Sequence, residues 1–331
     1  MVFPQMRQEN FIERSSCPSC NSGSLTRLLC RSYEDPLIQK YLVEFYTLQG
    51  YVEPEFLKGV DYVIEKCADC ALIFQRFVPN EEMMVRIYEH WIDPVLTFEQ
   101  FERSHEYSYY LDYATTIDAV IRFIGRIPSK IKILDFAMGW GNWAQMARAF
   151  GCEVYGTELS ESRLAFACRN NIEIIQWEDI PGSDFDFVNT DQVFEHLAEP
   201  RRILGHLCGG LSENGFLRIC VPDGSEIEKK LENENWTADK NSPQSMNEVA
   251  PLEHINCFSN RSLKVFAGLE GLEAIRMPYR LTNEGLVKET FGEQLKLSLR
   301  SIKWLTSRLI NRNRVENVST DLYFRKPRRD S

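Results

Sequence analysis

The stretch 131-IKILDFAMGWGNWA-144 decides the fold of this 331-residue chain. Its apolar run ends on Asp135, and a short turn then offers Gly139 and Gly141 ahead of an amphipathic stretch. A strand that leads through a glycine turn into a helix brings the backbone close to a nucleotide-like ligand. The sequence therefore predicts a ligand-binding α/β unit that begins near residue 130.

A carboxylate precedes the first glycine of this turn, because Asp135 lies four residues before Gly139. A negative charge there would repel a bound pyrophosphate, whereas it would attract a cationic sulfonium amino acid. Asp135 therefore favours a sulfonium ligand. A dinucleotide remains the alternative, because residues 139–144 also fit the G-x-G-x-x-A form of a dinucleotide fingerprint.

Short apolar runs alternate with helical periodicity after residue 130, and Ser160 is the expected N-cap of the helix that follows the second run. This alternation predicts an α/β fold with a doubly wound, parallel sheet. Two final runs, 273–279 and 320–327, are expected to complete seven strands as an antiparallel pair. The other expected strands cover residues 130–137, 152–159, 172–177, 185–191 and 215–224.

Polar residues follow each of the first four predicted strands. Glu158 ends the second strand 23 residues after Asp135, where a carboxylate can accept both hydroxyls of a ribose. Asp179 follows the third strand, where it could meet an adenine amino group, and Asp191 and Gln192 follow the fourth. Ligands of such sheets bind at the carboxyl ends of the strands, so these residues are expected to converge on one crevice.

This combination resembles the class I S-adenosylmethionine-dependent methyltransferases, which implies their Rossmann-like sheet. The matching pieces are ILDFAMGWG, VYGTELSESRLAFA, WEDIP and FDFVNTDQVFEHLAEP, within about residues 130–225. By this resemblance the Asp135 turn would hold the methionine part of S-adenosylmethionine, Glu158 the ribose and Asp179 the adenine edge. Ala137 stands where the family often has glycine. The expected cofactor-binding residues are Asp135, Ala137, Gly139, Gly141, Glu158, Leu159, Asp179, Asp191 and Gln192.

Two Cys-x-x-Cys pairs stand out among the ten cysteines, and 46 residues separate them. Thiolates held in pairs by tight turns can supply the four ligands of a tetrahedral structural zinc ion. Coincidental pairs and a redox motif are the alternatives. The predicted zinc ligands are Cys17, Cys20, Cys67 and Cys70.

The division of the chain follows from these motifs. Residues 1–80 are expected to form a small zinc-binding module, with a hairpin around the second cysteine pair and a helical insertion between the pairs. Residues 81–128 are expected to form a helical linker or cap, and residues 129–331 the methyltransferase domain. Acceptor-side insertions are expected at 226–260 and 283–316.

The wider layout resembles bacterial methyltransferases that carry an N-terminal cysteine zinc module, many of which act on nucleotide-linked sugars or glycans. The phrase CPSC…CADCALIF followed by PNEEMMVRIYEHW carries this resemblance. It implies an acceptor that is a small molecule, a nucleotide sugar or a glycan. Members that methylate sugar carbon have a further C-terminal domain, whereas this chain ends soon after TDLYFRKP, so O-methylation is expected.

His254 is the expected general base, because PLEHINCFS lies where related enzymes place EH-x-x-x-FS. Glu253 is expected to orient it. The alternative is that this segment only packs the start of the next helix. His196, which follows the fourth strand, is interpreted as structural.

Charge and hydropathy exclude several classes of protein. The net charge of −10 and the isoelectric point near 5.2 argue against broad nucleic-acid binding. The N-terminal stretch does not read as a signal peptide and no run is long enough to span a bilayer, so a cytoplasmic location is expected. A homodimer is left open. The competing functions are an NAD(P)-dependent oxidoreductase and a non-catalytic protein that binds partners through its zinc module.

Overall fold

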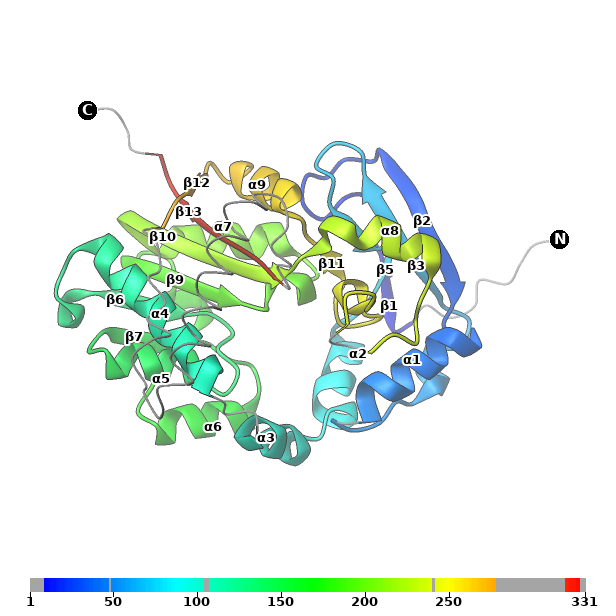
Figure 1. Cartoon of the computed structure of the whole chain (residues 1–331), viewed down its shortest axis with the longest axis horizontal. Helices are drawn as coiled ribbons and strands as arrows, with labels where there is room; N and C mark the ends of the chain where they lie inside the picture. The colour runs from blue at the N-terminus through cyan, green and yellow to red at the C-terminus, as the bar shows by residue number, and fades with distance from the viewer. Residues whose placement is uncertain (1–8, 48, 104–106, 240–241, 278–318, 328–331) are drawn as a thin grey trace, which may run out of the picture.

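A seven-stranded sheet forms the larger half of the molecule (Figure 1). The computed structural model describes residues 9–47, 49–103, 107–239, 242–277 and 319–327. Within them the strand order is β12-β13-β10-β9-β6-β7-β8. The strands are β6 (Lys132–Asp135), β7 (Glu153–Gly156), β8 (Glu173–Ile174), β9 (Phe185–Asp191), β10 (Leu211–Pro222), β12 (Glu273–Ile275) and β13 (Ser319–Arg325).

The pairing within this sheet matches the prediction. Strands β10, β9, β6, β7 and β8 are parallel to their neighbours, whereas β13 runs antiparallel to both β10 and β12. The predicted α/β sheet with a final antiparallel pair is therefore confirmed. Because the five parallel strands point the same way, their carboxyl ends form one edge, where a ligand crevice is expected.

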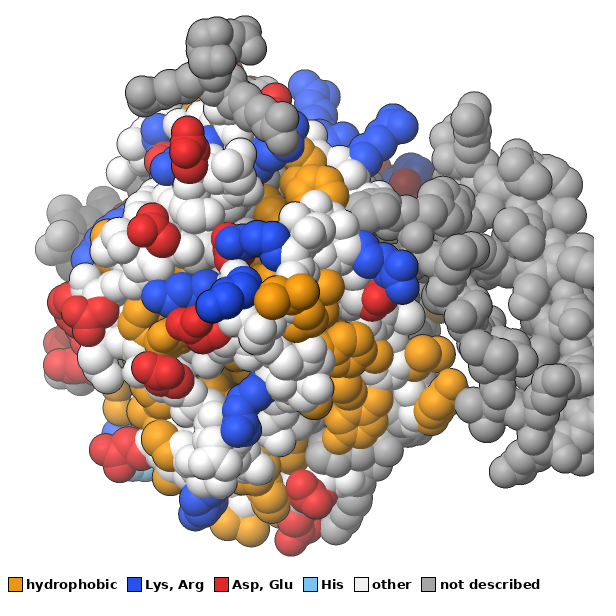
Figure 2. All heavy atoms as spheres, turned by 90° about the vertical axis from the view of Figure 1, so that its left-hand side faces the viewer, with side chains coloured by type: hydrophobic (Ala, Val, Ile, Leu, Met, Phe, Trp, Pro, Cys, Tyr) orange, Lys and Arg blue, Asp and Glu red, His pale blue; other side chains and the backbone are white. Residues whose placement is uncertain are grey.

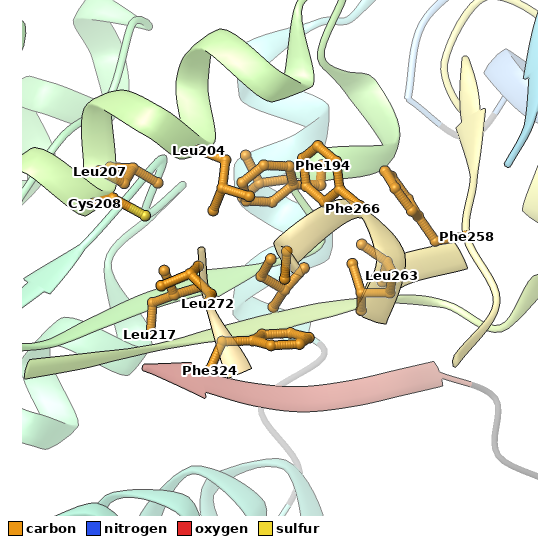
Figure 3. Close-up of a cluster of buried hydrophobic side chains, with 14 of the residues drawn as sticks. Phe194, Leu204, Leu207, Cys208, Leu217, Phe258, Leu263, Phe266, Leu272 and Phe324 are labelled. Atoms are coloured by element: carbon orange, nitrogen blue, oxygen red, sulfur yellow. The ribbon is translucent and has the colours of Figure 1, made fainter. Parts of the chain in front are cut away.

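Helices cover both faces of the sheet. The helices α4 (Tyr107–Ile124), α5 (Asn142–Ala149) and α6 (Glu161–Arg169) pack on one face. On the other face lie α7 (Pro200–Gly210) and α9 (Asn260–Gly268). Figure 3 shows Leu204 and Leu207 of α7 and Phe266 of α9 turned toward Leu217 and Phe324 on the strands.

The smaller half holds the cysteines in a second sheet of order β11-β4-β3-β2. Its strands β3 and β4 form the predicted hairpin, and α1 (Pro36–Thr47) is the predicted helical insertion. A two-stranded ribbon of β1 and β5 lies beside it. The strands are β1 (Phe11–Glu13), β2 (Leu25–Ser32), β3 (Asp61–Cys67), β4 (Ile73–Gln75), β5 (Phe77–Pro79) and β11 (Asn256–Cys257).

The two halves share a core, because part of the segment 226–260 packs on the smaller half. Helix α8 (Ile227–Asn233) lies over β2 and β3 (Figure 1). The ring of Trp236 meets the rings of Tyr41 and Tyr62 edge-on at 5.5 and 5.6 Å. Strand β11 adds to β4 as the outer strand of the cysteine sheet. The predicted acceptor-side insertion therefore ties the cysteine module to the large sheet.

Short helices connect the halves. They are α2 (Glu81–Arg86), the π-helical turn η2 (Ile87–Trp91) and α3 (Pro94–Arg103), which agrees with the helices expected in 81–128. The insertion expected at 283–316 lies outside the described residues. Among the described helices, none is both long and apolar enough to cross a membrane. On the outer face of the large half, acidic and basic side chains are interspersed with apolar ones (Figure 2).

Candidate functional site

The turn after β6 is shaped by left-handed backbone. Ala137, Gly139 and Gly141 have φ values of +54°, +59° and +75°. A Cβ atom on Gly141 would lie 2.7 Å from Cδ1 of Ile172, the end of a side chain that can rotate, so glycine is favoured there chiefly by the left-handed conformation. Ala137 adopts a conformation that glycine favours. The turn thereby brings its backbone to the carboxyl edge of the sheet, and α5 starts at Asn142.

Asp135 is a buried carboxylate at the foot of this turn. Its side chain is 3% exposed, and Oδ1 accepts a hydrogen bond of 2.8 Å from Nδ2 of Asn189. Its Oδ2 is buried without a hydrogen-bond donor among the described residues. Burial raises the pKa of Asp135 to about 7, although the Asn189 bond acts in the opposite direction. A cationic group at the turn would supply the missing partner and favour the ionised form.

A polar row continues from Asp135 across the neighbouring strands. Arg218 of β10, with only 4% of its side chain exposed, donates to Asn189, to Asp191 at 3.3 Å and to Asp321 of β13 at 2.8 Å. This row was not predicted. The signal for it was the charged residue inside the apolar strand LRICV, since a buried arginine requires acidic partners.

The remaining expected cofactor residues lie around the same edge. Glu158 follows β7, and its Oε1 accepts the backbone N–H groups of Leu159 and Ser160. The Leu159 side chain is 97% exposed. Asp179 is exposed on the 3-10 turn η4 (Trp177–Asp179), five residues after β8 ends. Gln192, with a φ of +56°, is anchored by its backbone N–H to the carbonyl of Cys220.

A second cluster lies beside the end of β9, where Glu195 and His196 on the 3-10 turn η5 (Phe194–His196) meet His254. The rings of His196 and His254 are 4.9 Å apart at 74°. Nδ1 of His196 lies 2.9 Å from the carbonyl of Glu253, and Nδ1 of His254 bonds the carbonyl of Asn247. Both rings are therefore held through Nδ1 by backbone oxygens.

The Glu253 carboxylate is held by tyrosines of the N-terminal region. Tyr46 of α1 donates to Oε1 at 2.6 Å, and Tyr88 of η2 donates to Oε2 at 3.3 Å. Glu253 was expected to orient His254; the structure holds the His254 ring at Nδ1 through the Asn247 carbonyl. Sequence reasoning missed both tyrosines, because they lie at least 165 residues from Glu253.

Arg14 clamps the two histidine segments together. Its buried guanidinium donates to the carbonyls of Leu197 and Ala198, after His196, and to the carbonyl of Ile255 and Oδ1 of Asn256, after His254. The amide of Asn256 in turn donates to the carbonyls of Phe194 and Leu197. The N-terminal module thereby fixes the spacing of loops that are far apart in sequence.

Replacing Arg14 with methionine is expected to lower the free energy of unfolding by about 2–4 kcal/mol, because two buried and two partly buried acceptors lose their donor. Denaturant unfolding measures this loss. The exposed Arg27→Met on β2 is the control and should stay within about 0.5 kcal/mol of the wild type. A loss in Arg14→Met no larger than that of the control would contradict the clamp.

The four cysteines of the two pairs come together at the end of the cysteine sheet. Sγ of Cys17 lies 3.4 Å from Sγ of Cys70, and Sγ of Cys20 lies 3.5 Å from Sγ of Cys67. All four sulfur atoms lie within 4.8 Å of one another. Sulfur atoms around a tetrahedral zinc ion are about 3.8 Å apart, so the cluster fits such an ion.

The backbone repeats the same turn at both cysteine pairs. Asn21 and Ala71, each one residue after a pair, have φ values of +59° and +62°. Their N–H groups donate to the carbonyls of Cys17 and Cys67, respectively. The two equivalent turns direct their four thiols to the same point, an arrangement that allows one metal ion to bind all four.

One family model matches the chain. The model of the family described as "Methyltransferase domain" matches residues 105–276, more than half of the chain. No curated protein matches the sequence.

Several solved structures are similar. The plantazolicin methyltransferase BpumL in complex with a monoazolic desmethylPZN analog and SAH is 16% identical, with a TM-score of 0.46 and coverage of 74% of this chain and 93% of that one. A SAM-dependent methyltransferase from Archaeoglobus fulgidus is 17% identical, with a TM-score of 0.38 and coverage of 70% and 98%. Because the TM-scores of these structures are only 0.46 and 0.38, the assignment of the chain to a family rests on the family model alone.

Proposed function

Because the chain belongs to the methyltransferase domain family, we propose that it methylates an oxygen of a small molecule, a nucleotide sugar or a glycan. The prediction of an S-adenosylmethionine-dependent methyltransferase is confirmed by this membership, which argues against the oxidoreductase alternative. The acceptor class and O-methylation rest on the resemblance of the whole layout and on the histidine cluster beside the crevice.

Asp135 is the observation that carries the cofactor assignment. Its buried oxygen without a donor lies behind a turn of left-handed backbone, which suits an amino acid with a positive charge. In this proposal Asp135 and the turn 137–141 hold the methionine part, and Glu158 and Leu159 lie on the ribose side. Asp179 is assigned to the adenine side, and Asp191 and Gln192 complete the cofactor-binding set at the end of β9. When bound, the cofactor supplies an electrophilic methyl group.

His254 is assigned as the proton acceptor. With its Nδ1 proton donated to the Asn247 carbonyl, its lone pair is on Nε2, the atom that would take the proton of the acceptor hydroxyl. The Glu253 carboxylate, fixed by Tyr46 and Tyr88, lies 3.8 Å from Nδ1 of His196, whose ring contacts that of His254. Such a negative charge favours the imidazolium formed when a histidine accepts a proton.

The cysteine cluster is proposed to hold a structural zinc ion, since its four thiols saturate a tetrahedral metal and leave no position for substrate. Its role is to stabilise the module that supplies Tyr46 and Arg14. A homodimer and a cytoplasmic location are proposed from the sequence alone.

Calorimetry with S-adenosylmethionine and with NAD(H) tests the cofactor assignment. Only the first should bind. Because the pKa of Asp135 is about 7 and the ligand ammonium prefers the ionised carboxylate, affinity should fall about tenfold for each pH unit below 7 and level off above it. In Asp135→Asn the affinity should be lower and no longer vary with pH. Binding of NAD(H) alone, or of neither compound, would overturn the assignment.

A panel of nucleotide-linked sugars, free sugars and phenolic hydroxyl compounds tests the acceptor class through the release of S-adenosylhomocysteine. Release with a nucleotide-linked sugar, and a methyl ether in the product, would support the proposal. Methylation at carbon or nitrogen would refute O-methylation without affecting the cofactor assignment.

A further inference from the structure

Glu195 is a carboxylic acid whose burial the methyl-transfer chemistry does not explain. Only 1% of the residue is exposed, and both of its oxygens are buried without a hydrogen-bond donor among the described residues. Burial raises its pKa well above the ordinary value. A carboxylate is retained in such a place when a cation compensates for its desolvation.

The two histidines beside it are held as metal ligands usually are. Metal-binding histidines commonly donate one ring N–H to a backbone carbonyl, which fixes the tautomer and leaves the lone pair on the other nitrogen. Nδ1 of His196 faces the Glu253 carbonyl, and Nδ1 of His254 faces the Asn247 carbonyl. With the protons on Nδ1, both Nε2 atoms carry the ligand lone pairs.

The three groups are close enough to share one ion. Nε2 of His196 lies 3.8 Å from Oε1 of Glu195, and one potential ligand atom of each of the three residues lies within 4.8 Å of the other two. Ligand atoms around a zinc or nickel ion at about 2.1 Å are roughly 3–3.4 Å apart, so small side-chain rotations would close the site. Two imidazoles with one carboxylate suit divalent first-row transition metals rather than calcium or magnesium.

We propose that Glu195, His196 and His254 bind a divalent transition-metal cation at a second site, separate from the four-cysteine cluster. The cation has a consequence that rests on the proposed function. One lone pair on Nε2 of His254 cannot serve a metal and a proton at the same time. Occupancy of the site therefore inhibits methyl transfer.

Cobalt(II) titration of the full chain, with zinc already in the cysteine cluster, tests the site. One further equivalent of Co²⁺ should bind, with the weak visible bands of nitrogen and oxygen ligands and without intense thiolate charge-transfer bands. Glu195→Gln and His196→Asn should each weaken this binding at least about tenfold. His206→Asn, a histidine stacked on Trp177, is the matched control and should bind Co²⁺ as the wild type does.

Several results would overturn the proposal: Co²⁺ uptake only by displacement of zinc, thiolate bands in the new spectrum, or equal affinity in all variants. If Glu195→Gln does not fold, the Co²⁺ affinity of His196→Asn tests the site instead. A quarter of the His196 side chain is exposed, so this substitution is easier to accommodate. Turnover measured over the same Co²⁺ range should fall to half its value at the Co²⁺ concentration at which half of the site is occupied. Since the spectral readout needs no turnover, a failed methyltransferase assignment would leave the metal result interpretable.

Discussion

Replacing His254 with alanine is expected to lower kcat by about 10²–10⁴-fold, the usual contribution of a general base. The side chain is nearly buried, and the Asn247 carbonyl fixes its tautomer. Affinity for S-adenosylmethionine should stay within about twofold, because the cofactor-side residues lie on other strand ends. Single-turnover methyl transfer to the acceptor found in the panel, together with calorimetry of the cofactor, measures both quantities.

The pH profile separates a base from a packing residue. In the wild type the rate should rise with pH as the histidine loses its proton and becomes able to accept another, and the variant should lack this rise. His206→Asn is the control and should retain both the rate and the profile. Unchanged turnover in His254→Ala would leave only the packing role that the sequence also allowed.

The large sheet could be predicted from sequence because its signals are local. Strand β9 was expected at 185–191 and is found at Phe185–Asp191. The glycine turn and the N-cap position of Ser160 likewise depend on neighbouring residues. Such patterns are short-ranged, so a single sequence contains them.

The contacts between the two halves could not be predicted, because they depend on residues far apart in the chain. Strand β11 has only two residues, Asn256 and Cys257, too few to show any alternation, yet it completes the cysteine sheet. Arg14 lies 183 to 242 residues from its four acceptors. Nothing in its local sequence distinguishes it from a solvated arginine.

Local geometry also limited the prediction of the crevice. Asp179 was expected to follow a third strand at 172–177; the strand itself ends at Ile174, and Asp179 lies on the 3-10 turn that comes after it. Gln176 is closer in sequence to the strand end. The pattern IEIIQW predicted a longer strand, because apolar residues continue past the last paired residue.

Loss of the cysteine cluster should have the largest effect on the protein. Structural zinc contributes about 10–16 kcal/mol to the folding of small zinc-binding peptides, so a Cys67→Ser, Cys70→Ser double variant should lose the fold of residues 9–79. The module holds Tyr46 and Arg14, and its strand β4 pairs with β11 next to His254. Methyl transfer should therefore fall more than about 100-fold, although no cysteine lies among the assigned catalytic residues.

Binding of S-adenosylmethionine should survive this loss better than turnover does, because its assigned residues follow strands of the large sheet, and the core under α4, α5 and α6 contains none of the four cysteines. Elemental analysis should find one zinc per wild-type chain and none in the variant, and calorimetry should find cofactor affinity within about tenfold. Cys30→Ser and Cys168→Ser, at exposed cysteines, serve as controls. Full turnover in a zinc-free variant would show that the cysteine module assembles without its metal. Loss of both turnover and cofactor binding would show that the two halves of the molecule fold as one unit.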